Sequence, residues 1–199
     1  MTPSARLIDL ILSAVLIVGA YQFYFWCQRH PLTATRQFRS PLDERIPFVP
    51  GWVWIYSFLY YPAILCVNLV VSSADEFNRV AASYLLLLAL QSAFFVVLPV
   101  RTPEHWRSER DGPGLSQRFL CFVQRFDAPS NSFPSMHTSV AVLTAMHLTG
   151  TFGSAVWAFP VLIGISCLFT KQHYLVDLPA GAGLGWVAHE GYRLLLAAA

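Results

Sequence analysis

Charged residues are scarce in this chain of 199 residues. Asp, Glu, Lys and Arg together make up 12% of the sequence, whereas hydrophobic residues make up 55%. Because roughly a quarter of the residues in a soluble domain are charged, the composition excludes a soluble protein and indicates one membrane domain, residues 1–199. The net charge of +2 and the lack of a long basic run also exclude nucleic acid as a partner.

The sequence also lacks the closely spaced cysteines of a metal site. Its four cysteines occur without a Cys-x-x-Cys pair and without the Cys/His spacing typical of zinc sites. They are Cys27, Cys66, Cys121 and Cys167. We therefore predict no metal and no other cofactor.

Long apolar segments, in contrast, fill most of the chain. Six of them are apolar and long enough to cross a hydrocarbon layer of roughly 30 Å as helices. They cover residues 7–26, 51–71, 79–100, 136–149, 152–170 and 178–197. The sequence thus predicts an all-α integral membrane protein built as a six-helix bundle. In the last segment Gly181 and Gly185 share a helical face, and this spacing predicts a close approach to another helix.

A polar stretch, residues 101–131, separates the third segment from the fourth. Apolar side chains recur in it at helical spacing, while Arg118 and Arg125 lie on another face. The apolar positions are Leu115, Phe119, Phe122, Val123 and Phe126. This pattern predicts a short helix that lies in the membrane interface. The charged residues before it, 107–111, have the composition of a solvated loop.

Two histidines stand at predicted helix ends, His137 at the start of the fourth segment and His173 just after the fifth. One imidazole can attack phosphorus and form a phosphohistidine, and a second can protonate the leaving oxygen. Asp177, four residues after His173, can orient that ring from the same helical face. Six crossings place both histidines, Asp177 and Arg101 on the same side of the membrane. The residues therefore predict phosphoryl chemistry at that face.

A Pro-Ser-Met-His run ending at His137 and a His-x-x-x-Asp pattern ending at Asp177 resemble two signatures of the type 2 phosphatidic acid phosphatase superfamily. The resemblance covers about residues 98–185, the expected catalytic half. Membrane members of that superfamily are six-helix lipid phosphatases and phosphotransferases. The resemblance implies that His173 is the nucleophile, Asp177 its orienting partner and His137 the acid. Ser135 and the neighbouring amides at a helix N-terminus would bind phosphate oxygens.

Three positions depart from the family pattern. Met136 stands where glycine is usual, beside the phosphate, Cys167 stands where an arginine is expected, and Phe94 replaces a lysine. Arg101 supplies the remaining arginine and is our expected phosphate clamp, with an interfacial anchor as its alternative role. Lys171, four residues after Cys167, could deliver an ammonium to the phosphate in place of the missing arginine. Its alternative role is that of a lysine snorkelling to the interface.

We expect a metal-independent enzyme that hydrolyses a lipid phosphate or diphosphate through a phosphohistidine. The pattern without the upstream arginine is similar to the branch that contains inositol phosphorylceramide and sphingomyelin synthases. A phosphotransferase that moves a headgroup between lipids is therefore the first alternative, and a non-catalytic lipid-phosphate binding protein is the second. The partners are then a lipid phosphate and the membrane, with the oligomeric state left open.

The charge pattern and the resemblance disagree about orientation. Ten basic residues flank the face with the histidines and three, Arg6, Arg79 and Arg193, flank the other, which places the histidines in the cytoplasm by the positive-inside rule. The resemblance instead implies an extracytoplasmic site. We expect a multi-pass protein of the bacterial inner membrane with an extracytoplasmic site, where Cys27 and Cys121 could pair in an oxidising compartment.

Overall fold

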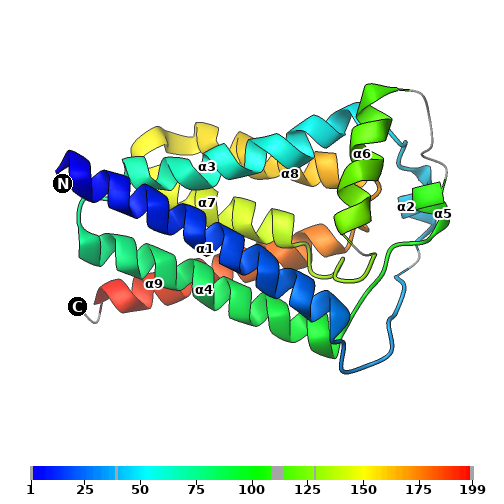
Figure 1. Cartoon of the computed structure of the whole chain (residues 1–199), viewed down its shortest axis with the longest axis horizontal. Helices are drawn as coiled ribbons and strands as arrows, with labels where there is room; N and C mark the ends of the chain where they lie inside the picture. The colour runs from blue at the N-terminus through cyan, green and yellow to red at the C-terminus, as the bar shows by residue number, and fades with distance from the viewer. Residues whose placement is uncertain (1, 39, 109–113, 128, 198–199) are drawn as a thin grey trace.

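The computed structural model describes residues 2–38, 40–108, 114–127 and 129–197, most of which lie in helices, and the described residues form no β-strand. The long helices run side by side along the molecule, with both termini at the same end (Figure 1). The α-helices are α1 (Pro3–Arg29), α2 (Pro41–Arg45), α3 (Tyr60–Cys66), α4 (Ala74–Val97), α5 (His105–Ser108), α6 (Leu115–Phe126), α7 (Met136–Phe152), α8 (Ala158–Phe169) and α9 (Asp177–Ala197). The predicted all-α class is confirmed.

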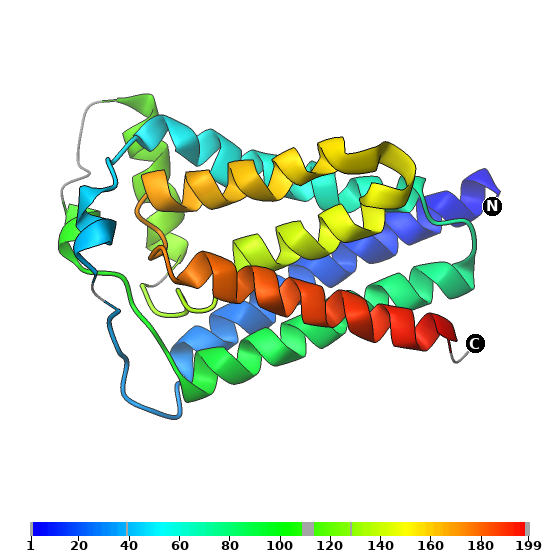
Figure 2. The same ribbon diagram turned by 180° about the vertical axis from the view of Figure 1, so that it is seen from behind.

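Four helical stretches among the described residues are long and apolar enough to cross a membrane. They are Pro3–Arg29, Pro50–Leu69, Ala74–Val97 and Met136–Phe169. The last stretch holds α7 and α8, which are joined by the 3-10 helix η4 (Gly153–Trp157) and fold back beside each other (Figure 2). These stretches support a membrane protein, while the number of six crossings stays a prediction.

The second stretch changes its helical type around a proline. The 3-10 helix η1 (Pro50–Trp52) and the π-helix η2 (Ile55–Leu59) precede α3, and the 3-10 helix η3 (Val67–Leu69) follows it. Pro62, in the first turn of α3, has no N–H to donate to a carbonyl of the preceding turn. The π-helical turn η2 lies directly before α3, where Pro62 leaves a backbone carbonyl without its usual helical hydrogen bond. Such a turn is expected where a helix bends at a proline.

Helix α9 approaches α7 closely through two glycines. A Cβ atom on Gly181 would overlap the carbonyl oxygen of Ser135, and one on Gly185 would overlap that of Ser139. The close approach predicted from the glycine spacing is confirmed. It brings the starts of α7 and α9 together, where the Ser135 amide donates a hydrogen bond of 3.0 Å to the carbonyl oxygen of Asp177.

The predicted short helix before the fourth segment is present as α6, which lies across one end of the bundle (Figure 1). Its Phe119 ring stacks on Trp54 at 4.7 Å and on Phe58 at 5.5 Å, so the apolar face of α6 covers the start of the second stretch. That α6 lies parallel to the membrane plane stays a prediction. All four cysteines are free thiols, so the pairing of Cys27 with Cys121 is absent from this structure.

Candidate active site

A tight turn at the end of α8 delivers His173 to the site. The amide of Lys171 donates to the carbonyl oxygen of Leu168 (3.1 Å), and the amide of Gln172 donates to that of Cys167 (3.0 Å). This pair of bonds is a Schellman motif, in which the residue after the cap adopts the left-handed conformation. Lys171 holds that position with a φ of 57°, although glycine is commoner there.

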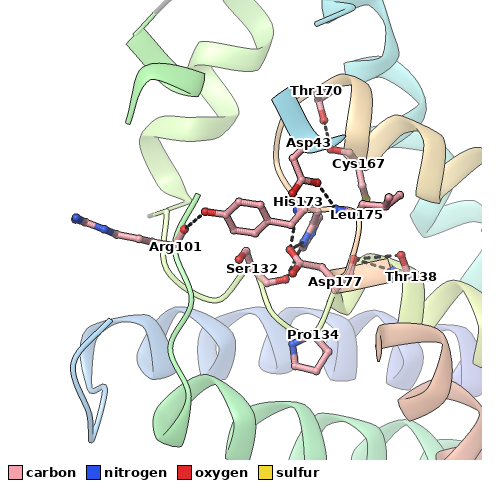
Figure 3. A network of polar contacts seen from close by, with 12 residues as sticks. Asp43, Arg101, Ser132, Pro134, Thr138, Cys167, Thr170, His173, Leu175 and Asp177 are labelled. Atoms are coloured by element: carbon pink, nitrogen blue, oxygen red, sulfur yellow. Dashed lines mark hydrogen bonds and ion pairs between the residues drawn. The ribbon is translucent and has the colours of Figure 1, made fainter. Parts of the chain in front are cut away.

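Two oxygen acceptors hold one nitrogen of the His173 ring. Nδ1 lies 2.8 Å from the carbonyl oxygen of Ser132 and 3.2 Å from Oδ2 of Asp177 (Figure 3). A carbonyl oxygen only accepts hydrogen bonds, so Nδ1 carries the proton, and in the neutral ring Nε2 carries the lone pair. Oδ2 of Asp177 also accepts from the amide of Tyr174 at 2.9 Å. The buried carboxylate therefore fixes both the ring and the turn that carries it.

His137 lies in the first turn of α7, beside the His173 ring. The two ring centres are 5.9 Å apart, and the planes are inclined by 67°. His137 stacks on Tyr56 at 4.2 Å and lies 5.2 Å from Tyr60, and both tyrosines are buried. These aromatic contacts orient the second imidazole toward the first.

The N-terminus of α7 provides positive backbone charge next to the rings. Ser135 is fully buried, and its hydroxyl oxygen accepts from the amide of Thr138 at 3.3 Å. The first amides of a helix have no intrahelical acceptor, and the helix dipole adds partial positive charge there. The amides of Met136 and His137 therefore form a helix end of the kind that can bind an anion.

A small polar pocket opens beside both histidines. Its lining includes Arg107, Asp127, Gln172, His137 and His173. The Arg107 guanidinium donates to the carbonyl oxygen of Asp127 at 2.9 Å, while its Nε has no hydrogen-bond partner among the described residues. Burial lowers the pKa of this guanidinium, and the nearby Asp127 carboxylate opposes that shift. Arginine nevertheless stays charged in proteins, so the pocket contains a cation.

The sequence did not predict Arg107 as a site residue, because it belongs to a charge-balanced stretch that has the composition of a solvated loop. The only sequence signal was its place on the same side of the membrane as the histidines. The rest of that stretch, residues 109–111, lies outside the described residues.

Arg101 and Lys171, the cations expected at the phosphate, point elsewhere. The Arg101 side chain is 43% exposed, lies 3.6 Å from Glu104 and points away from His173 (Figure 3). Lys171 is buried, and its Nζ donates to the carbonyl oxygen of Asp43 at 2.6 Å. The same Nζ stands 4.8 Å from the centre of the Trp106 ring. Neither residue is among those that line the polar pocket in the described part of the chain.

Cys167 joins the histidines from α8. It is fully buried, and its Sγ and one ring nitrogen from each of His137 and His173 all lie within 4.8 Å of one another. Sequence spacing did not reveal this cluster, because its members are 30 and 6 residues apart along the chain.

The fold and the site define a class, an all-helical membrane protein with two adjacent imidazoles, one of them hydrogen-bonded to a buried carboxylate. A family model described as the PAP2 superfamily matches residues 37–190, and the chain belongs to this superfamily of type 2 phosphatidic acid phosphatases. The family predicted from the two motifs is confirmed, and membership supports lipid phosphatase chemistry in general. No curated protein and no solved structure matches the chain.

Proposed function

We propose that this protein is a membrane lipid phosphatase that releases phosphate from a lipid phosphate or diphosphate through a phosphohistidine on His173. The observation that carries the proposal is the pair of oxygen acceptors on Nδ1 of His173. They leave Nε2 with a lone pair, in a ring that adjoins His137. A ring held in one tautomer beside a second imidazole supplies both a nucleophile and an acid.

In the first step, Nε2 of His173 forms a bond to phosphorus while the bond from phosphorus to the lipid oxygen breaks. His137 gives its proton to that leaving oxygen, so the lipid departs as a neutral alcohol, or as a lipid monophosphate when the substrate is a diphosphate. In the second step, water attacks phosphorus and gives a proton to His137. The bond to Nε2 breaks, phosphate leaves, and both rings return to their starting states. Asp177 stabilises the positive charge that His173 gains in the intermediate.

The phosphate oxygens have two sources of positive charge in this proposal. Arg107 reaches the polar pocket with a planar, permanently charged guanidinium. The amides of Met136 and His137 add the helix end, and Ser135 caps it. No metal ion takes part in these steps.

We assign different roles to Arg101 and Lys171. Arg101, exposed and beside Glu104, fits the interfacial anchor. Lys171 fits a positioning role, because its ammonium binds the carbonyl oxygen of Asp43 while the Asp43 carboxylate accepts from the amide of Leu175 at 2.7 Å. Both contacts tie α2 to the turn that carries His173.

An aromatic groove gives a lipid tail a route to the histidines. It runs between α1, the second stretch and α6, and it holds about 1,110 Å³ including its open side. His137 and Met136 are among its lining residues, and the remaining lining includes Tyr21, Phe25, Tyr61, Phe119 and Phe122. A mostly apolar groove whose lining includes a few polar groups is typical of a site for an amphiphilic ligand.

The groove and helix α6 also suggest how the protein sits in the bilayer. We propose that α7, α8 and α9 each cross the membrane, which makes six crossings, and that α6 lies in the interface above the groove. We further propose that the site faces the extracytoplasmic side of a bacterial inner membrane.

The proposal is tested with purified protein in detergent and a panel of lipid phosphates and diphosphates, with and without alcohol acceptors. We expect release of inorganic phosphate, inhibition by vanadate, and loss of activity in His173→Ala and His137→Ala. His30→Ala is the matched control, because His30 is exposed. A new phospholipid in place of free phosphate would assign the transferase instead. Lipid binding without either product, or full activity in both histidine variants, would refute the hydrolytic mechanism.

A further inference from the structure

Three side chains from three parts of the fold converge on a single point beside the pocket. His137 comes from the start of α7, Cys167 from α8 and His173 from the turn before α9. Their donor atoms, two ring nitrogens and a sulfur, lie within 4.8 Å of one another. Cys167 and His173 are buried and His137 is partly buried, so the cluster is largely shielded from solvent.

We propose that His137, Cys167 and His173 form a binding site for a soft divalent cation such as Zn²⁺, and that the bound cation inhibits the enzyme. The inhibitory part rests on the proposed function, since it assumes that His173 is the nucleophile. Imidazole nitrogen and thiolate sulfur are the ligands that zinc prefers, and three protein ligands leave one position for water.

The distances suit such a site after a small contraction. Zinc binds nitrogen at about 2.0–2.1 Å and sulfur at about 2.3 Å, so tetrahedral donors lie roughly 3.3–3.6 Å apart. The three donors lie within 4.8 Å of one another, so the widest pair needs to close by at most about 1.2–1.5 Å to reach this spacing, which side-chain rotations can provide. The polar pocket beside the two histidines offers the route for the ion.

The surroundings of His173 prepare its ring as a ligand. Metal-bound histidines donate their second nitrogen to a carboxylate or a carbonyl oxygen, which fixes the ring and raises its basicity. Nδ1 of His173 has both kinds of acceptor, Oδ2 of Asp177 and the carbonyl oxygen of Ser132. Binding converts the Cys167 thiol into a thiolate, and the proton leaves to water in the polar pocket.

Inhibition follows because the cation and phosphorus need the same electrons. The lone pair on Nε2 of His173 cannot attack phosphorus while it binds zinc. Coordination of His137 also removes the proton carrier for the leaving oxygen. A cation in this cluster would therefore compete with substrate and with vanadate.

The experiment uses Co²⁺ as a spectroscopic probe for the full-length protein in detergent. A cobalt–thiolate bond gives an intense charge-transfer band in the near ultraviolet, and nitrogen or oxygen ligands alone do not. We expect the band to saturate at one Co²⁺ per chain in the unmodified protein. It should vanish in Cys167→Ala and persist in Cys66→Ser, whose cysteine lies outside the cluster. Cys167→Ser serves if the alanine variant does not fold.

A parallel assay measures inhibition of phosphate release by Zn²⁺. We expect Cys167→Ala to need at least tenfold more Zn²⁺ than the unmodified protein, with Cys66→Ser unchanged. An absent band, or a band that survives without Cys167, overturns the metal site even if the enzyme is active. A Cys167-dependent band in a protein that hydrolyses no lipid phosphate keeps the metal site and refutes the phosphatase and the inhibition built on it.

Discussion

Oδ2 of Asp177 lies 3.2 Å from Nδ1 of His173 and also accepts from the amide of Tyr174. The carboxylate is therefore part of the backbone turn as well as a partner of the imidazole. The same oxygen accepts from the His173 ring and from the Tyr174 amide. A substitution by the isosteric Asn therefore removes the negative charge while an oxygen can keep both hydrogen bonds.

We expect Asp177→Asn to fold and to lose roughly 10²–10⁴ in kcat, because the neutral amide no longer stabilises the charged ring. KM should change by much less, since Asp177 does not contact the substrate. Steady-state phosphate release measures both constants, and Asp75→Asn in the first turn of α4 is the control. An unchanged kcat in Asp177→Asn would remove Asp177 from the mechanism.

The second prediction concerns Arg107, the cation that we propose binds the phosphate. Arg107→Gln should weaken vanadate inhibition by roughly 10- to 100-fold, as expected when a charge-assisted hydrogen bond is lost. Arg107→Lys should recover only part of it, because an ammonium lacks the two-pronged geometry of the guanidinium. Arg101→Gln is the matched control and should stay within about threefold. Equal losses at both positions would return Arg101 to the phosphate.

The third prediction tests the contact between α7 and α9. An added methyl group on Gly185 would overlap the carbonyl oxygen of Ser139, whereas one on Gly183 would meet nothing within 4 Å. Gly185→Ala should therefore destabilise the protein by about 1–3 kcal/mol. It should also move the start of α9, which carries Asp177, away from the start of α7, which carries His137. Gly183→Ala should be neutral or slightly stabilising, since alanine favours helix. Thermal inactivation in detergent compares the two, and similar midpoints would contradict the packing.

Features set by short stretches of sequence were predictable. The helical class, α6 and the glycine contact follow from local composition and spacing, and the two histidines follow from their positions at helix ends. Arg107 reaches the site only through tertiary packing, and no motif marks it. The family resemblance marked position 167 as that of a phosphate-binding arginine, but the contact of Cys167 with both histidines depends on tertiary packing. The direction of the Lys171 side chain depends on the Schellman turn at the end of α8. The usual sequence signal for such a turn is a glycine at the left-handed position, where this chain has Lys171.

The last prediction uses Asp127, which borders the polar pocket. Its Oδ1 accepts from the hydroxyl of Tyr24 at 2.9 Å and from Nε2 of Gln28 at 2.6 Å, and burial raises the pKa of the carboxyl while Arg107 opposes that shift. The folded protein thus holds the proton more tightly than the unfolded chain, in which the pKa is about 3.9. The contribution of protonated Asp127 to the free energy of unfolding is therefore fully present below that pH. It is lost as the pH rises through the folded-state pKa.

Asp127→Asn removes this dependence and keeps an oxygen that can accept both hydrogen bonds. The thermal midpoint of the variant minus that of the unmodified protein should therefore increase as the pH rises from about 4 and then level off above the folded-state pKa. Because both proteins share every other titrating group, the difference isolates Asp127. A difference that is flat with pH would mean that folding does not shift the pKa of Asp127, and a difference that shrinks as the pH rises would mean that Arg107 stabilises the charged carboxylate. Either result contradicts the prediction.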